Sequence, residues 1–211
     1  MTVTSALLSF ALVAGLLTLV PGLDTALVLR TAITQGRRPA FAAALGIGTG
    51  SLVWGATAAV GVSALLTAST LAYTALRLAG AVYLLWLGGQ LIRETFGRRA
   101  APPDDTPAPA GGGAWRAWRR GALTNLLNPK VGAFYLAVIP QFLPAHAPHL
   151  AMGLLLALVH NAEGMAWFTL LILAAHTLRG WLERTSVRRA IDRLTGMALV
   201  GFGLKLALSP N

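Results

Sequence analysis

The chain of 211 residues lacks cysteine altogether and has few charged side chains. Without cysteine it can form no disulfide, no thiolate nucleophile and no thiolate metal site. Charged residues make up 11% of the sequence, whereas soluble proteins contain roughly 25%. Hydrophobic residues make up 55%, and the mean hydropathy is +0.65. This composition excludes an ordinary soluble domain and predicts an integral membrane protein.

Acidic residues are scarcer still, with seven against 17 lysines and arginines, which gives a formal net charge of +10. A basic excess of this kind can indicate binding to nucleic acid or to anionic lipid. Here the basic residues lie beside long hydrophobic runs, where they act as membrane topology signals. We therefore expect a lipid bilayer as the partner of these charges, and no nucleic acid.

Hydropathy predicts an all-α protein with six transmembrane helices. The expected spans are residues 5–33, 39–67, 70–92, 121–143, 150–178 and 190–208. A stretch rich in proline, glycine and alanine, residues 97–120, separates the third span from the fourth and is expected to be a hydrophilic cytoplasmic linker. The chain is thereby divided into a first three-helix repeat at 1–96 and a second at 121–211.

Arginine placement predicts the orientation of these spans. The loops after the first, third and fifth spans are rich in arginine, whereas the N-terminus and the loops 68–69 and 144–149 contain no lysine or arginine. Because lysine and arginine concentrate in cytoplasmic loops, the arginine-rich loops are expected inside the cell. Both termini are then expected outside, in a multi-pass protein.

The first span contains Pro21, Gly22 and Asp24 within its hydrophobic run. Pro21 removes a backbone donor and clashes with the preceding turn, so the helix should break there. Freed backbone groups are tolerated at membrane depth only where protein or water satisfies them, and a carboxylate there is unfavourable too. The combination is typical of a solute pathway. The alternative is a kinked helix whose acid is satisfied by a neighbour.

The fourth span is interrupted in the same way, by Asn128, Pro129 and Lys130. Asp24 and Lys130 each lie nine residues from the cytoplasmic end of their spans, or on the order of 13 Å at 1.5 Å per helical residue. An acid and a base at one depth can pair directly, or can bind the two charges of a zwitterion separately.

A short phrase near the third span also recurs near the sixth, as Arg-Leu-Ala-Gly at 77–80 and Arg-Leu-Thr-Gly at 193–196. Together with the two broken spans, it predicts two inverted repeats of three helices, broken at Pro21 and Pro129. This arrangement is typical of secondary transporters. The alternative is coincidence between short apolar sequences.

Five phrases, in this order and at this spacing, resemble the LysE/RhtB family of bacterial amino-acid exporters. They are residues 21–25 (Pro-Gly-Leu-Asp-Thr), 44–48 (Ala-Leu-Gly-Ile-Gly), 78–88, 125–130 (Asn-Leu-Leu-Asn-Pro-Lys) and 140–142 (Pro-Gln-Phe). The resemblance implies six spans in the bacterial inner membrane and efflux of amino acids or their derivatives, generally coupled to the proton gradient. It does not fix the substrate. Leu23 stands where the family usually has a second proline.

These observations predict a transport site rather than an enzyme, with no cofactor and no resident metal. The residues expected to bind substrate are Pro21, Gly22, Asp24, Asn128, Pro129, Lys130 and Asn161. The residues expected to carry protons are Asp24 and Glu163. A charge count favours a small neutral amino acid over a cationic one, with pocket walls from Val28, Leu127, Phe134 and the glycine-rich second span.

Three other functions remain open from the sequence. His160 and Glu163 share a helical face, and with Asp24 as a third ligand they could serve an exporter of divalent metal ions. His176 lies too far along the helix to join them without a bend. A membrane-embedded enzyme would need a catalytic pair on facing spans, and a channel would conduct without proton coupling. Homo-oligomerisation is also possible.

Overall fold

The computed structural model describes residues 2–68, 70–96, 113–144, 146–175 and 185–208. Within these ranges all regular structure is helical, and no strand is present. The helices are α1 (Val3–Leu19), α2 (Leu23–Gln35), α3 (Arg37–Ala68), α4 (Thr70–Glu94), α5 (Ala114–Leu126), α6 (Pro129–Val138), the short 3-10 helix η1 (Ile139–Phe142), α7 (His149–Leu173) and α9 (Thr185–Leu208). The predicted all-α class is confirmed.

Several of these helices have the length and composition of membrane spans. In α3 the segment Arg37–Gly61 is long and apolar enough to cross a bilayer, and so is α7. The pair α1 and α2, bent by 56° at its break, makes a third span if the two helices cross together. The molecule is therefore an all-α integral membrane protein, while the arrangement of six spans in two inverted repeats stays a prediction.

Both predicted helix breaks are confirmed. α1 ends at Leu19 and α2 begins at Leu23, with Pro21 between them. α5 ends at Leu126 and α6 begins at Pro129. Pro129 is the first residue of α6, a position that suits proline, because the backbone donor that it lacks would have no intrahelical partner there. Pro21 lies in the gap before α2, and at both breaks the chain restarts as a new helix.

The last residues of the predicted linker are helical. α5 begins at Ala114, so residues 114–120 form the first turns of a helix, and the division of the chain into two repeats and a linker stays a prediction. Alanine and arginine favour a helix, and the rings of Trp115 and Trp118 stack at a centroid distance of 4.8 Å across one turn. Residues 97–112 of the linker lie outside the described residues, as do His176 and the expected end of the fifth span. α9 begins at Thr185, earlier than the expected start at 190.

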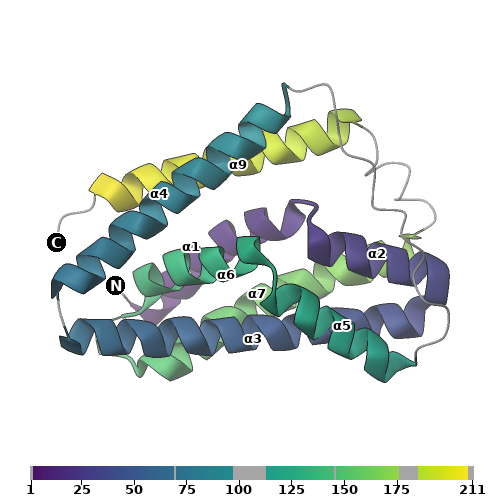
Figure 1. Ribbon diagram of the computed structural model, residues 1–211, viewed down its shortest axis with the longest axis horizontal. Coiled ribbons are helices and arrows are strands. Elements are labelled where there is room, and N and C mark those ends of the chain that lie inside the picture. The colour runs from purple at the N-terminus through teal and green to yellow at the C-terminus, as the bar shows by residue number, and fades with distance from the viewer. Residues whose placement is uncertain (1, 69, 97–112, 145, 176–184, 209–211) are drawn as a thin grey trace.

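Glycines allow α3 to pack closely against its neighbours. α3 contacts α2, α5 and α7, and Figure 1 shows it running along one side of the helix bundle. A Cβ at Gly46 would collide with the backbone carbonyl of Trp118, and a Cβ at Gly121 would collide with that of Ala43. Because only glycine fits these two positions, the backbones of α3 and α5 touch directly. This contact fixes α5, and with it the second break, against α3.

α4 and α9 lie side by side in opposite directions and form the edge of the bundle farthest from α3 (Figure 1). They meet at Gly88 and Gly196, where a Cβ on Gly88 would lie 2.6 Å from the Gly196 carbonyl oxygen. On the inside, this pair packs against α1 and α6. α9 therefore contacts α1, the helix before the first break, and α4 contacts α6, the helix after the second break.

The interior contains two apolar cores. One joins α1, α3, α4, α6, η1, α7 and α9 around Phe10, whose ring lies 6.4 Å from that of Phe134 and 5.6 Å from that of Phe142. The other joins α2, α3 and α7 around Val28 and Leu171. Both cores contribute residues to one polar cavity that lies between them.

Candidate functional site

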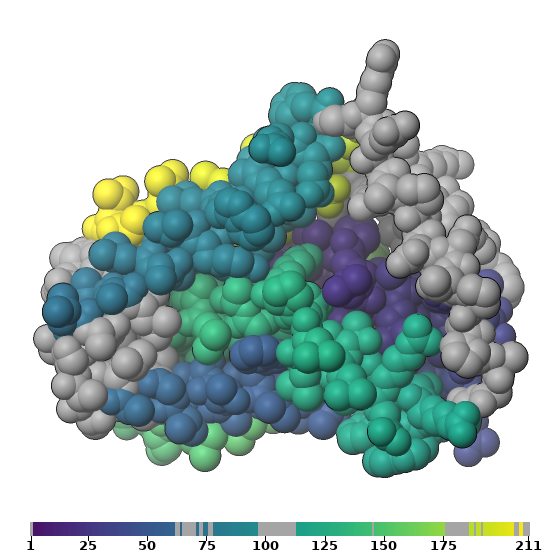
Figure 2. Space-filling view, in the orientation of Figure 1, coloured from purple at the N-terminus to yellow at the C-terminus, as the bar shows by residue number. Residues whose placement is uncertain are grey.

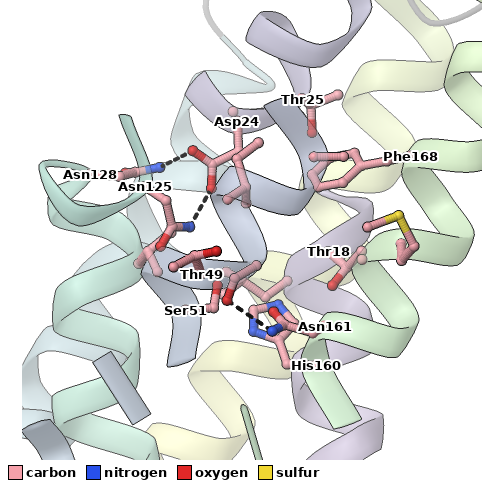
Figure 3. Close-up of a pocket in the computed structure, with 18 of the residues that line it drawn as sticks. Thr18, Asp24, Thr25, Thr49, Ser51, Asn125, Asn128, His160, Asn161 and Phe168 are labelled. Carbon is pink, nitrogen blue, oxygen red and sulfur yellow. Dashed lines mark hydrogen bonds between the residues drawn. The ribbon is translucent and has the colours of Figure 1, made fainter. Parts of the chain in front are cut away.

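A cavity of about 290 Å³ lies where the two helix breaks meet (Figure 3). A water molecule occupies ~30 Å³ in the liquid, so the cavity has room for one small solute. Helices α1, α2, α3, α5, α6 and α7 all contribute to its wall. Its polar lining consists of Thr18, Asp24, Thr25, Thr49, Ser51, Asn125, Asn128, Lys130, His160 and Asn161. Among the lining residues, Asp24 is the single carboxylate and Lys130 the single ammonium.

Asp24 lies in the first turn of α2, immediately after the first break. A helix N-terminus stabilises a negative charge, because its backbone N–H groups point toward it. The Nδ2 atom of Asn125 donates to Asp24 Oδ2 at 2.8 Å, and Nδ2 of Asn128 donates to Asp24 Oδ1 at 3.4 Å. Figure 3 shows both amides pointing at the carboxylate from the second break. The two breaks are thus joined through one acid.

Asn128 has a second contact at the start of α6. As the N-cap residue of that helix, it accepts a hydrogen bond from the backbone N–H of Lys130 at its Oδ1, with a length of 3.1 Å. Asparagine is among the best N-cap residues, because its side-chain oxygen satisfies a backbone donor that has no intrahelical partner. One side chain therefore both begins α6 and holds the acid of α2.

Lys130 occupies the second position of α6, as Asp24 does in α2. A Cβ built on Gly22 would lie 3.8 Å from Lys130 Nζ, so the ammonium reaches the backbone of the first break. The polar contacts of the Asp24 carboxylate come from the two amides rather than from Lys130. Lys130 has favourable electrostatic interactions with the carboxylates of Asp192 and Asp24.

The sequence reasoning overlooked Asp192. It lies on α9 with 8% of its surface exposed, and one turn later Thr195 Oγ1 donates to the carbonyl oxygen of Leu16 at 3.3 Å. Asp192 comes two residues after the expected start of the sixth span, where a charge is usually interfacial. Asp192 directly precedes the repeated Arg-Leu-Thr-Gly phrase, and this position could have identified it as a candidate site residue. Asn125 was also missed as a site residue, although it belongs to the phrase that contains Lys130.

Two polar residues of α7 face the cavity. Asn161 Nδ2 donates to the backbone carbonyl of Gly48 at 2.9 Å, so it ties α7 to α3 at the cavity wall. His160 Nδ1 and the hydroxyl of Tyr135 share a hydrogen bond of 2.9 Å. The structure thus brings Asn161 together with Asp24, Asn128 and Lys130, as expected for one site. Gly22 also lines the cavity, whereas Pro21 and Pro129 are not among the lining residues and act through the helix breaks.

Glu163 is not among the residues that line the cavity. It lies between α7 and α1, where a Cβ built on Gly15 would stand 3.4 Å from Glu163 Oε1. Its Oε2 is buried without a hydrogen-bond partner among the described residues. Its expected role in carrying protons stays a prediction, now for a carboxylate beside the cavity rather than in it.

Three residues expected to wall the cavity do not line it. Val28 and Phe134 are fully buried, each in a different core, and Leu127 is 78% exposed on the surface. Val28 and Phe134 pack into the two apolar cores and Leu127 lies on the surface, so none of the three faces the cavity. The expected glycine-rich wall is present through Gly48. The larger apolar wall residues include Ile47, Met165 and Phe168, from α3 and α7.

A metal site has no support within the part of the chain that the structure describes. No group of three His, Asp or Glu side chains is placed there to hold a metal ion. Asp24 and His160 line one cavity, but Glu163 faces Gly15 instead. His176 lies outside the described residues.

The sequence model of the LysE type translocator family matches residues 15–210. The chain belongs to this family. It is 30% identical to the leucine efflux protein of Klebsiella pneumoniae, over 95% of this chain and 93% of that protein. It is 30% identical to the threonine efflux protein of Escherichia coli K12, over 90% and 91% of the two chains. The membrane protein YrhP of Bacillus subtilis is 28% identical, over 96% and 99%. No solved structure matches.

Membership of a translocator family agrees with the broken helices and the central polar cavity. It confirms the predicted family, which is a family of translocators. The relatives are bacterial, and the apolar helices place the protein in the membrane. The cavity between the two breaks is therefore the candidate transport site of a multi-pass inner-membrane protein.

Proposed function

We propose that this protein exports a small neutral amino acid, or a close derivative, in exchange for protons. The observation that carries the proposal is the charge of the cavity: one carboxylate and one ammonium, each just after a helix break. A zwitterionic amino acid has the complementary pair of charges. Relatives named for leucine and threonine efflux support the same class of substrate.

In this proposal the α-ammonium of the substrate binds Asp24, and the α-carboxylate binds Lys130 and the backbone N–H groups at the breaks. The two asparagine amides keep the Asp24 carboxylate oriented when the cavity is empty. The substrate's side chain lies against Ile47, Met165 and Phe168, which favours small or branched aliphatic groups. A cationic amino acid would require a second acid, and the lining residues include none.

The charge count from sequence reaches the same substrate class by a different route. That count assumes that Asp24 pairs with Lys130, which leaves Glu163 as the remaining acid within the spans. In the structure Asp192 also acts on Lys130, and Glu163 lies off the cavity. Asp24 is therefore the acid left to meet the substrate. If it holds either a proton or the substrate's ammonium, but not both, export and proton entry alternate by competition. Glu163, beside α1, is the second candidate proton carrier.

The membrane orientation belongs to the same proposal. In this proposal the start of α3 with Arg37 and Arg38, and the start of α5 with its arginines, lie in the cytoplasm, and both termini lie outside. The substrate then enters from the arginine-rich side and leaves on the opposite one.

The test is an efflux assay in cells loaded with dipeptides of each of the twenty amino acids, with and without expression of the protein. We expect selective release of small neutral amino acids, and loss of that release when an uncoupler collapses the proton gradient. Selective release of lysine or arginine would overturn the neutral-substrate assignment. Release of a divalent ion, with no amino acid moving, would assign the protein to metal export. Release that an uncoupler leaves unchanged would indicate a channel.

Substitution then tests the site itself. Asp24→Asn should abolish export while the protein still accumulates in the membrane, whereas Glu94→Gln removes an exposed carboxylate and should export normally. If Asp24→Asn exports at the normal rate, the site lies elsewhere and Glu163 becomes the first candidate. A double variant, Asp24→Asn with Lys130→Met, should accumulate better than Lys130→Met alone if the two charges compensate each other.

A further inference from the structure

We propose that α5 carries a binding site for one anionic phospholipid, on the face opposite its contact with α3. A shallow hollow of about 340 Å³ opens on this face and shares no lining residue with the transport cavity. It is lined by Arg116, Arg119, Arg120, Leu123, Thr124 and Leu127. Figure 2 shows the surface of α5 in teal-green on the face that is turned to the viewer. The site is independent of the proposed substrate and of the residues that hold it.

Helical spacing places these six residues on one face. Their separations of three and four residues form a continuous stripe along α5. The other face of the helix is buried through Ala117, Gly121, Ala122 and Asn125, and its contact with α3 is a direct backbone contact at Gly121. With that side fixed against α3, the arginine and leucine stripe faces outward.

The stripe changes chemistry along its length. Its first turns hold three exposed arginines. Guanidinium groups bind phosphate oxygens in a bidentate manner. Its last turns hold Leu123, 53% exposed, and Leu127, 78% exposed. A free phosphate or a soluble polyanion would use only the arginines and leave the leucines facing water, whereas a phospholipid has both a phosphate and an acyl chain.

The length of the stripe matches one lipid leaflet. Arg116 and Leu127 are eleven residues apart, or about 16 Å at 1.5 Å per residue. Half of a hydrocarbon core of about 30 Å is about 15 Å. The stacked rings of Trp115 and Trp118 lie at the arginine end, and tryptophan is enriched at the level of lipid headgroups. The arginines therefore lie at headgroup depth while Leu123 and Leu127 lie along the acyl chain.

The acyl end of this site lies next to the second break. Leu127 directly precedes Asn128, the residue that begins α6 and hydrogen-bonds Asp24. A bound acyl chain would pack over Leu127 and cover the second helix break on its lipid-facing side. The lipid would thus support the geometry of the transport site without touching the transported solute.

Native mass spectrometry of the purified full-length protein tests the proposal, with phosphatidylglycerol and phosphatidylcholine supplied together. We expect one retained phosphatidylglycerol. Each arginine near an anionic surface contributes on the order of a five-fold preference, so three should give on the order of a hundred-fold preference over phosphatidylcholine. The test variant is Arg116→Gln, Arg119→Gln, Arg120→Gln, and the matched control, which loses the same charge elsewhere, is Arg37→Gln, Arg38→Gln, Arg93→Gln.

The proposal holds if the test variant loses the retained lipid and the control keeps it. Equal retention by both variants would overturn it, and so would equal retention of the two lipids by the native protein. Displacement of the lipid by inorganic phosphate would assign the arginines to a soluble anion instead. If the test variant fails to fold, a second experiment takes its place. A fluorophore is attached to the Leu127→Cys variant, whose cysteine is unique because the native chain has none. Brominated phosphatidylglycerol should then quench this fluorophore more than brominated phosphatidylcholine does, and equal quenching would refute the site.

Discussion

Asn125→Ala should impair transport far more than it impairs folding. Asn125 is 1% exposed and provides the shorter of the two hydrogen bonds to Asp24, at 2.8 Å against 3.4 Å from Asn128. A hydrogen bond to a charged group contributes about 1.5 to 3 kcal/mol. Losing it from the substrate-bound carboxylate should lower the efflux efficiency by about ten- to 150-fold.

The free energy of unfolding should change little, because two effects oppose each other. The substitution removes a donor from Asp24, but it also removes Asn125 Oδ1, which is buried without a partner among the described residues. Each effect is about 1 to 3 kcal/mol and they have opposite signs. Asn128→Ala differs, because it also removes the N-cap of α6, which should lower the stability by about 0.5 to 2 kcal/mol.

The assay combines efflux from proteoliposomes with thermal unfolding in detergent, for both variants and the native chain. Asn125→Ala should unfold near the native temperature and transport slowly, and Asn128→Ala should be reduced in both measurements. The reasoning fails if Asn125→Ala transports at the native rate, because Asp24 would then not depend on its closest donor. It also fails if Asn125→Ala unfolds well below Asn128→Ala.

Three further predictions test the packing, the topology and the coupling. A Cβ at Gly50 would lie 2.6 Å from Asn125 Oδ1, so Gly50→Ala should displace that amide and lower export, whereas Gly61→Ala, with nothing within 4 Å, should export normally. Equal export by the two would show that the position of the amide does not matter. Reporter fusions at Arg98 and Asn211 should be cytoplasmic and external, respectively, and a cytoplasmic C-terminus would overturn the inverted repeat. In proteoliposomes, an inward proton gradient should accelerate amino-acid efflux, and efflux indifferent to the gradient would exclude antiport.

The sequence was sufficient to locate both helix breaks, because proline and glycine interrupt a helix through the backbone, whatever surrounds them. It was also sufficient to bring Asp24, Asn128 and Lys130 into one site, since their depth follows from counting residues along two spans. The glycines of the second span are typical of closely packed helices. Gly46 makes such a contact in α3, where its backbone lies against the carbonyl of Trp118.

What the sequence could not predict depends on contacts between distant helices. The direction of a helix after a break is set by its neighbours, so the sequence did not reveal that Leu127 is exposed and that Phe134 is buried in a core instead of lining the cavity. Asp192 acts on Lys130 only because α9 packs beside the first break, across more than sixty residues of chain.

The two hydrogen bonds of Asn128 restrict the motions that can separate the two helix breaks. Its oxygen begins α6 and its nitrogen holds the acid of α2, so any motion that separates the two breaks must withdraw an amide from that acid. The Asp24 carboxylate then loses a hydrogen bond, and water, a proton or the ammonium group of a bound substrate must replace it. If Asp24 binds the substrate as proposed, these two contacts of Asn128 stabilise the resting state, and binding of a proton or of the substrate's ammonium to Asp24 favours its release.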